Sequence, residues 1–481
     1  MSALEAEPAD ILAELRELRE HDAPTHGGRV LSYVYDPGLA ELDELAANAA
    51  KLMQPVNGLD PTTFGSVAAL ERDVVGFVRG LLHGDAEVVG TATSGGTESC
   101  LLAVKTARDA WVAAGGTGTP RLVLPATAHA AFQKAAHYFG LELDLVPVSA
   151  DGVVSADDIG ERLGDDVALV VVSAPSYPVA ALDPVEAVAA LTSERGIPLH
   201  VDACIGGLVL PFWPRLPKWD FAVPGVTSMS ADLHKYGYAP KGVSVLLQRG
   251  RDRQRLQYFA TTRWPGYPVV NPTILGSKSA GPLAAAWAIT KALGESGFQR
   301  LADSTRRSTD AIVSAIGRIE GLRVLGEPAG PLLAVAADPR AGVDGQVDPH
   351  HWADAVRGLG FVLQLQPANG DIPSTTHLTI TPVTEKVLPE LLAALAKGAD
   401  AVRGIPHVDA SELLGSLPPL DGALDSDTAA AILQGFGIGA GGALPDALAP
   451  LLAIIEATPA PLAERLLTEL LARLVEPPAK N

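Results

Sequence analysis

Seven short apolar runs, rich in β-branched residues, alternate with longer helical stretches between about residues 88 and 249. The runs are apolar at consecutive positions instead of every second one, which is typical of strands covered on both faces. Helical segments between most of the runs suit the crossover connections of a parallel sheet. The sequence therefore predicts an α/β fold built on a mainly parallel seven-stranded sheet. The predicted strands are Val88–Ala92, Arg121–Leu124, Leu143–Val148, Val167–Val172, Ile197–Val201, Phe221–Val223 and Val243–Leu247.

The chain around this region divides into further parts. Residues 1–60 are expected to form an N-terminal helical segment, residues 61–290 a large domain and residues 291–410 a smaller α+β domain. Residues 411–481 form a Pro/Gly/Ala-rich helical extension of unknown role, in which the glycines of 435–442 are expected to form a turn, because no strand precedes them and no GK[ST] follows. The other predicted elements are an amphipathic helix with Ile11, Leu12, Leu15 and Leu18 on one face, helices at 283–293, 298–319, 351–358 and 461–474, and strands at 322–325, 332–335 and 378–380.

Composition excludes several classes of function. The chain has 36 Lys and Arg against 56 Asp and Glu, so it lacks a basic stripe for nucleic acid and would be repelled by anionic lipid. The acidic N-terminus does not resemble a signal peptide, and no window approaches the roughly 18 consecutive apolar residues of a membrane span. The two cysteines, Cys100 and Cys204, cannot build a disulfide framework or a thiolate zinc site. We therefore expect a cytoplasmic protein with no nucleic-acid partner, no membrane anchor and no metal site.

The motif Thr93-Ser-Gly-Gly-Thr-Glu-Ser follows a predicted strand and precedes a predicted helix at 99–113. Its glycines, Gly95 and Gly96, let the backbone approach an anion closely, and the free amides of a helix start favour phosphate. Thr97 suits the N-cap position of that helix. A phosphate-binding turn and an ordinary strand-to-helix turn both explain this segment, and the segment alone does not decide between them.

Two charged residues follow other predicted strands. Asp202 comes directly after the run that ends at Val201, and ligands of open α/β sheets bind at that carboxyl edge. Lys235 lies in a loop between two strand-like runs. Either residue alone is usually a solvated surface charge. Together with a phosphate-binding turn they match the needs of pyridoxal phosphate, which are an amine to bond its aldehyde, an anion against its ring nitrogen and amides for its phosphate.

Five ordered blocks between about residues 27 and 400 closely resemble the sphingosine-1-phosphate lyase family, a branch of the group II pyridoxal-phosphate decarboxylase superfamily. The blocks are Thr93–Ser99, Ala128–Ala136, His200–Gly207, Ser230–Gly242 and Pro272–Lys278. The resemblance implies fold type I of the pyridoxal-phosphate enzymes and pyridoxal 5'-phosphate as the cofactor. It also implies a homodimer with shared active sites, in which the turn at Gly276 and Ser277 serves the cofactor phosphate of the other subunit.

The resemblance also implies a role for each matching residue. Lys235 is the lysine that binds the cofactor covalently, Asp202 faces the ring nitrogen and His129 stacks on the ring. Tyr35 and Lys241 match positions that line the substrate site. The residues implied to hold the cofactor phosphate are Gly95, Gly96, Thr97, His234 and the partner subunit's Ser277. The alternatives are that His129 is a polar residue at a helix start and that Tyr35 is a surface aromatic residue. Cys204 is expected to be a small packed residue and not a nucleophile.

Two departures from the family pattern concern the substrate. The family has Leu-His-Pro, whose histidine helps to hold the substrate phosphate, where this chain has Leu59-Asp60-Pro61. The carboxylate of Asp60 opposes phosphate binding. Tyr267 falls two places early for the family's Gly-Gly-x-Tyr, and Val269 stands near the tyrosine position. We therefore expect an amine substrate that is unphosphorylated or differently charged.

The resemblance implies a lyase that cleaves the Cα–Cβ bond of a β-hydroxy amine to an aldehyde and a smaller amine. A decarboxylase that breaks the bond between Cα and the carboxylate of an amino acid is the alternative. A cofactor-binding regulatory module without turnover is a minor alternative. Such a module would be expected to lose Lys235 or Asp202, and the chain has both.

Overall fold

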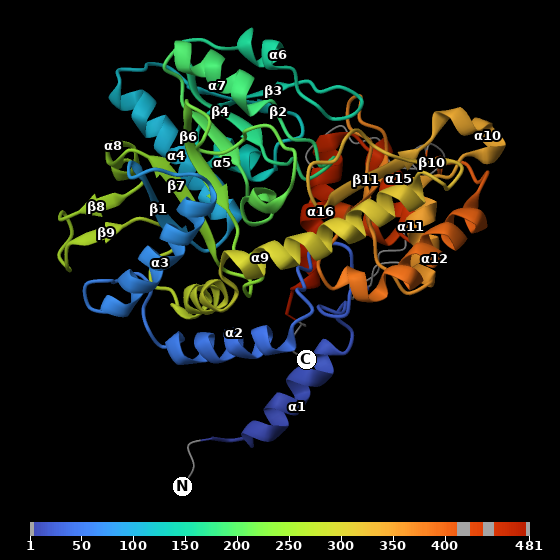
Figure 1. Cartoon of the computed structure of the whole chain (residues 1–481), viewed down its shortest axis with the longest axis horizontal. Helices are drawn as coiled ribbons and strands as arrows, with labels where there is room; N and C mark the ends of the chain where they lie inside the picture. The colour runs from blue at the N-terminus through green and yellow to red at the C-terminus, as the bar shows by residue number, and fades with distance from the viewer. Residues whose placement is uncertain (1–3, 411–423, 436–446, 478–481) are drawn as a thin grey trace.

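The computed structural model describes residues 4–410, 424–435 and 447–477, and two sheets organise it (Figure 1). The large sheet has the strand order β1-β7-β6-β5-β4-β2-β3, and a smaller sheet has the order β10-β11-β13-β12. The strands of the large sheet are β1 (Val88–Thr93), β2 (Arg121–Pro125), β3 (Glu142–Val146), β4 (Val167–Ser173), β5 (Leu199–Asp202), β6 (Val226–Ala231) and β7 (Ser244–Arg249).

The strands of the large sheet share one direction except β7, which pairs antiparallel with both β1 and β6. The remaining pairs, from β6 through β5, β4 and β2 to β3, are parallel. Every residue of β4 and β5 is buried, as expected for strands that are covered on both faces. The predicted α/β fold with a mainly parallel seven-stranded sheet is confirmed.

One of the seven predicted strands is wrong, and another strand takes its place. Phe221–Val223 forms a turn in which the Asp220 carboxylate accepts a hydrogen bond from the Ala222 amide at 2.9 Å. The strand at this place in the sheet is β6, which begins at Val226. Its small polar residues conceal it in the sequence, and they are buried because Ser228 and Ser230 pair with the ring of His200 on β5.

Helices cover the large sheet and join it to the smaller one (Figure 1). The helices predicted at 283–293 and 298–319 form one element, α9, which is kinked at Gly294 with φ +54° and runs from the large sheet to the smaller one. The elements of this part are α2 (Ala40–Met53), α3 (Gly65–Leu81), α4 (Gly96–Ala113), α5 (Ala131–Phe139), α6 (Ala156–Gly160), α7 (Val185–Glu194), η1 (Gly206–Leu208), η2 (Leu210–Phe212), α8 (Arg251–Arg255), the paired strands β8 (Phe259–Thr261) and β9 (Val269–Asn271), and α9 (Gly281–Ile316).

The smaller sheet is antiparallel throughout and packs against α11, which in turn packs against α12. The sequence did not predict β12, because Gln364 and Gln366 flank a single apolar residue there. The elements are β10 (Leu322–Val324), β11 (Leu332–Ala337), η3 (Pro339–Ala341), α10 (Gly342–Gly345), α11 (Pro349–Gly358), β12 (Gln364–Gln366), β13 (Thr375–Thr379) and α12 (Thr384–Val402).

The two ends of the chain are helical in the described residues. The predicted amphipathic helix is present as α1 (Pro8–Arg19), but none of its residues is buried in this chain, and in Figure 1 it projects from the body. Near the C-terminus, α14 (Ser426–Gly435), α15 (Ala449–Ala457) and α16 (Ala460–Leu474) follow the small sheet. Ala429, Ile432, Leu433 and Leu466 form a separate small core there. The predicted glycine turn at 435–442 lies outside the described residues apart from Gly435.

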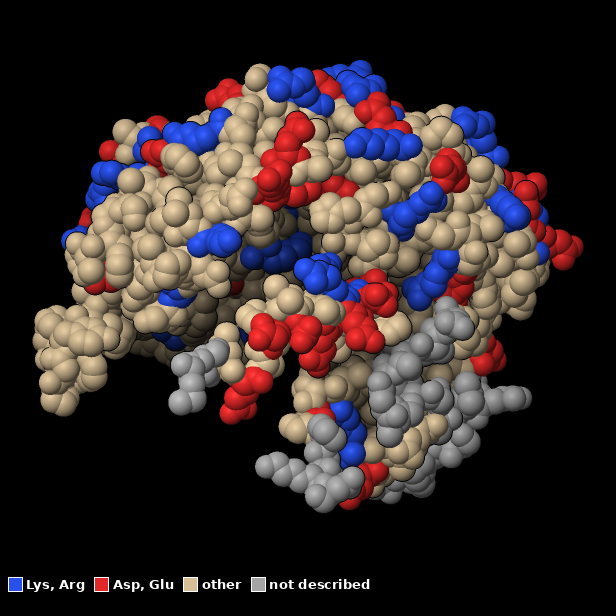
Figure 2. Space-filling view, turned by 90° about the horizontal axis from the view of Figure 1, so that it is seen from below, with Lys and Arg blue, Asp and Glu red and all other residues tan. Residues whose placement is uncertain are grey.

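On the face seen in Figure 2, acidic and basic side chains are interspersed, and basic side chains gather at a hollow instead of forming a stripe. Among the helices that the structure describes, none combines the length and the apolar character needed to cross a membrane.

A buried carboxyl group next to β4 makes a testable contribution to stability. The Asp183 carboxylate accepts a hydrogen bond from the Ser173 amide at 2.7 Å, and its other oxygen has no partner among the described residues. Burial raises the pKa of Asp183 to about 7. Because this pKa lies above the unfolded value near 3.8, the stabilising contribution is complete below about pH 4 and is lost as the pH rises through 7.

We expect Asp183→Asn to remove this pH dependence. Between pH 4 and pH 8, the free energy of unfolding of the wild type should fall relative to that of the variant by about 4 kcal/mol. Denaturant unfolding of both proteins across this range measures the difference. Parallel curves for the two proteins would show that Asp183 does not titrate in this window.

Candidate active site

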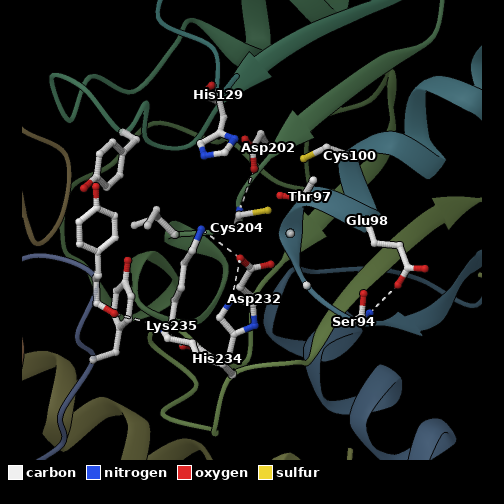
Figure 3. A pocket seen from close by; sticks show the side chains of 18 of the residues that line it. Ser94, Thr97, Glu98, Cys100, His129, Asp202, Cys204, Asp232, His234 and Lys235 are labelled. Atoms are coloured by element: carbon white, nitrogen blue, oxygen red, sulfur yellow. Dashed lines mark hydrogen bonds and ion pairs between the residues drawn. The ribbon is translucent and has the colours of Figure 1, made fainter. Parts of the chain in front are cut away.

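A cavity of about 530 Å³ opens where the strands of the large sheet end. β1, β2, β4, β5 and β6 all run toward it, so the residues that follow their last positions meet there. Figure 3 shows side chains from these strand ends converging on one space. Of the residues predicted from the sequence, those that line the cavity are Tyr35, Gly95, Gly96, Thr97, His129, Asp202, His234, Lys235 and Lys241.

The turn after β1 is built to bring backbone amides into the cavity. Helix α4 begins at Gly96, so its N-cap is Gly95, and the prediction that Thr97 is the N-cap is wrong. A Cβ atom on Gly96 would lie 2.6 Å from an oxygen of Asp232 and 2.8 Å from the sulfur of Cys204, so only glycine fits. No side chain caps the first turn of α4, which leaves its amides available to an anion.

Lys235 reaches the cavity from the loop that follows β6. Its ammonium lies 3.0 Å from a carboxylate oxygen of Asp232, which is almost fully buried. Burial opposes the charged lysine, but the Asp232 carboxylate outweighs it and holds the pKa of Lys235 well above its ordinary value. The attraction is mutual, because Lys235 and His234 keep the pKa of Asp232 low in spite of burial.

The sequence did not single out Asp232, although it lies three residues before Lys235 in the same block. One oxygen of its carboxylate holds the lysine, and the other is buried without a partner in the part of the chain that the structure describes. The signal that could have identified Asp232 is its place in the sequence, since it is an acidic residue directly after a strand and three residues before the lysine. Such an acid is positioned to pair with the lysine before a ligand arrives.

His234 is oriented by the backbone. Its Nδ1 donates to the carbonyl of Val243 at 2.8 Å, which leaves Nε2 on the cavity side, 3.5 Å from Asp232. Burial lowers the pKa of His234 even though Asp232 opposes that shift. The ring therefore presents a fixed nitrogen next to the glycine turn, where a Cβ on Gly95 would lie 3.3 Å from its Cε1.

Asp202 faces the cavity from the end of β5. One of its oxygens accepts hydrogen bonds from the Cys204 amide at 3.0 Å and the Ser230 hydroxyl at 3.2 Å. Cys100 and Cys204 are buried beside it as free cysteines. The pKa of Cys204 is well above its ordinary value because of the contact with Cys100 and burial, so it is a packed thiol and not a nucleophile. His129 also lines the cavity, near Asp202 in the view of Figure 3, and its Nδ1 accepts from the Ala131 amide at 3.1 Å.

The mouth of the cavity is aromatic. Lys241 Nζ lies 4.8 Å from the centroid of the Tyr35 ring and donates to the Tyr33 carbonyl at 3.0 Å. Burial raises the pKa of Tyr35 to about 12 and lowers that of Lys241. Tyr33 and Tyr177, which the sequence did not single out, also line the cavity. Gln364 on β12 links these two tyrosines, accepting from the Tyr177 hydroxyl at 2.8 Å and donating to the Tyr33 hydroxyl at 2.6 Å.

Two predicted residues, Asp60 and Ser277, do not line the cavity of their own chain. Asp60 is partly exposed, and one of its oxygens accepts from the Thr62 hydroxyl and from the amides of Thr62 and Thr63. These hydrogen bonds hold the pKa of Asp60 well below the ordinary range. Ser277 belongs to a segment held by Glu98, which accepts from the amides of Ile274 and Leu275 at 2.7 and 3.1 Å.

These residues fit a phosphorylated aromatic aldehyde. The cavity offers a primary amine, a carboxylate on a neighbouring strand end, and helix amides at a position where only glycine leaves room. Its volume lies in the range of small-molecule sites, roughly 300–1,000 Å³. The donor set and the space both suit pyridoxal phosphate together with an amine.

Two family models match this sequence. One, described as the pyridoxal-dependent decarboxylase conserved domain, matches residues 42–318. The other, described as a pyridoxal-dependent enzyme C-terminal putative HTH domain, matches residues 409–473.

Curated relatives and solved structures are similar as well. Sphingosine-1-phosphate lyase of Dictyostelium discoideum is 36% identical over 68% of this chain and 63% of its own length. The enzyme of Oryza sativa is 33% identical over 82% of this chain and 73% of its own length. The solved structure of the Burkholderia pseudomallei sphingosine-1-phosphate lyase has a TM-score of 0.78 at 32% identity and covers 84% of this chain and 93% of that one. Glutamate decarboxylase of Lactobacillus brevis shares the fold, with a TM-score of 0.74 at 19% identity.

The glycine turn provides a direct test of the site. We expect Gly96→Ala to lower the affinity for pyridoxal phosphate by about tenfold or more, because the methyl group would collide with Asp232 and Cys204. Gly76→Ala is the matched control, since nothing lies within 4 Å of a Cβ at that helical position. Titration of the cofactor-free proteins, followed by visible absorbance, measures both affinities. Equal affinities would mean that the turn does not hold the cofactor.

Proposed function

The chain belongs to the pyridoxal-dependent decarboxylase family, with the sphingosine-1-phosphate lyases among its relatives, and from this we propose that it is a pyridoxal-phosphate-dependent carbon–carbon lyase. The proposed reaction cleaves the Cα–Cβ bond of a β-hydroxy amine and releases an aldehyde and a smaller amine. The observation that carries the proposal is the single cavity in which Lys235, Asp202 and the turn at Gly95–Gly96 meet. Lys241, from the same block as Lys235, lines the same cavity. It matches a position that lines the substrate site in the lyase family, and it therefore favours the lyase.

Each cavity residue receives a role in the proposal. Lys235 holds the cofactor covalently, Asp202 faces its ring nitrogen and His129 stacks on the ring. The amides of Gly95, Gly96 and Thr97, with the Nε2 of His234, hold the phosphate. These roles are supported by the open first turn of α4 and by the carbonyl of Val243, which fixes the His234 ring. When bound, pyridoxal phosphate supplies an electron sink for the bond that breaks.

The protein residues then control protons. Asp202 keeps a proton on the ring nitrogen, because an opposite charge nearby favours the charged form. With Asp232 at 3.0 Å to stabilise its charge, the Nζ of Lys235 would carry a proton to the substrate Cα. At the mouth, Tyr35 has a pKa of about 12 and remains a hydrogen-bond donor. Burial lowers the pKa of Lys241, and we assign to this lysine the role of accepting the β-hydroxyl proton.

The assembly and location are also part of the proposal. We propose a homodimer in which the turn at Gly276–Ser277 serves the cofactor phosphate of the other subunit, supported by the position of Ser277 outside its own cavity. We also propose a reducing, cytoplasmic location, supported by the two buried free thiols.

Product analysis decides between the lyase and the amino-acid decarboxylase. Purified holoenzyme is incubated with 3-hydroxy amines and, separately, with amino acids, while aldehyde and CO₂ are both measured. We expect aldehyde from the hydroxy amines. CO₂ without aldehyde would replace the lyase by the decarboxylase. Lys235→Ala should abolish turnover and the visible absorbance of the bound cofactor, whereas the exposed Lys218→Ala should keep both. A colourless wild type that cannot be reconstituted would instead favour the regulatory module.

The charge of Asp60 is expected to set the preference for unphosphorylated amines. Asp60→Asn keeps an oxygen that can accept from Thr62 and Thr63 but removes the charge. We expect kcat/KM for a phosphorylated amine to rise by about tenfold in this variant, with little change for the unphosphorylated amine. Glu194→Gln, an exposed charge far along the chain, is the control. A wild type that already strongly prefers phosphorylated sphingoid bases would contradict this assignment.

A further inference from the structure

Three residues that could bind a metal meet where the C-terminal helices dock on the small sheet. They are His350 on α11, His407 in the segment after α12, and Glu456 on α15. One ligand atom from each lies within 4.8 Å of the other two. The cluster is separate from the cofactor cavity, since none of the three residues lines it. His350 is fully buried, whereas His407 retains two fifths of its side-chain exposure.

His350 presents an unused nitrogen. Its Nε2 lies 2.9 Å from the carbonyl of Gln366, so Nε2 carries the proton and donates it. Its Nδ1 is buried and has no partner among the described residues. In the neutral ring this nitrogen has a free lone pair. A buried lone pair without a donor calls for a partner, and a water molecule or a metal ion can supply one.

In His407 and in Glu456, one polar atom is held by a neighbouring residue, and the remaining two atoms are paired with each other. The Nδ1 of His407 donates to Asp348 at 2.8 Å, and Asp348 is itself fixed as the N-cap of α11. The other nitrogen, Nε2, lies 2.9 Å from an oxygen of Glu456. The second oxygen of Glu456 accepts from the Ala368 amide and the Ser374 hydroxyl, both at 2.8 Å.

We propose that His350, His407 and Glu456 bind a divalent transition-metal ion, with Zn²⁺ as the best match. Two imidazole nitrogens and one carboxylate form a zinc ligand set that leaves a fourth position open to water. Outer partners that hold the second atom of each ligand are typical of zinc sites, and here they are Gln366, Asp348 and the pair Ala368 and Ser374. An ion pair of His407 with its two carboxylates would explain part of the cluster but would leave the Nδ1 of His350 without a partner.

Binding requires a small contraction of the cluster. Zinc–nitrogen and zinc–oxygen bonds of roughly 2.0–2.2 Å bring tetrahedral ligand atoms closer together than the outer limit of 4.8 Å seen here. His407 would make that adjustment, because it keeps two fifths of its side-chain exposure and residues 405–410 form neither helix nor strand. The metal would thereby fasten α15 and the segment before residue 410 to α11, at the start of the C-terminal match at 409–473.

Metal binding to the full-length, cofactor-loaded protein tests the proposal. The protein is treated with a chelator, dialysed, and titrated with zinc chloride by calorimetry, with metal content measured after gel filtration. We expect one zinc per chain from this site, and slower proteolysis of the C-terminal helices when zinc is present. A protein that binds no zinc would overturn the proposal.

Three variants locate the metal. We expect His350→Ala, His407→Ala and Glu456→Gln each to weaken zinc binding by about 100-fold. Glu456→Gln keeps an oxygen for Ala368 and Ser374, so it tests the charge even if a histidine variant folds poorly. His351→Ala, a neighbouring histidine outside the cluster, should bind zinc as the wild type does. Zinc that persists in all three variants and disappears in Cys100→Ser would place the metal in the cofactor cavity and overturn the proposal.

Discussion

The buried ion pair between Lys235 and Asp232 determines how the end of the large sheet is built. A buried aspartate such as Asp232 remains ionised only with a cation beside it, and the ammonium of Lys235 supplies that cation at 3.0 Å. The space that Asp232 occupies is the space a side chain at position 96 would need, so the turn that begins α4 must be glycine. The Lys235 amine, the Asp232 carboxylate and the uncapped start of α4 therefore depend on one another through the same packing contacts.

The sequence was sufficient for the parts of the molecule in which pattern and chemistry agree. Consecutive apolar runs identified the deeply buried β4, and ordered blocks identified eight of the predicted residues that line the cavity. Prediction failed where a polar residue is buried for a reason of tertiary structure. β6 is a central strand although serines break its apolar run, because the ring of His200 on β5 needs partners. Asp232 was missed for the same reason, since only the fold shows that it is enclosed with Lys235.

Local patterns also could not show which segments meet across the molecule. β12 is too short and polar to be identified, yet Gln364 links the hydroxyls of Tyr33 and Tyr177 at the mouth of the cavity. Gln366 on the same strand accepts from His350 and donates to the Pro178 carbonyl. A three-residue strand of the small sheet thus contacts both the cofactor cavity and the cluster under the C-terminal helices. These contacts depend on the position of the small sheet, which no single segment determines.

The missing side chain at Gly96 has a consequence for how proteins of this design can diverge. A position that rejects even one methyl group is closed to nearly all mutations, so position 96 itself has little room to change. The opposite half is lined by Tyr33 and Tyr35 from one loop and by Tyr177 and Lys241 from two others, and none of these positions requires glycine. New substrate specificities would therefore arise from substitutions at the mouth of the cavity, while the glycine turn stays unchanged.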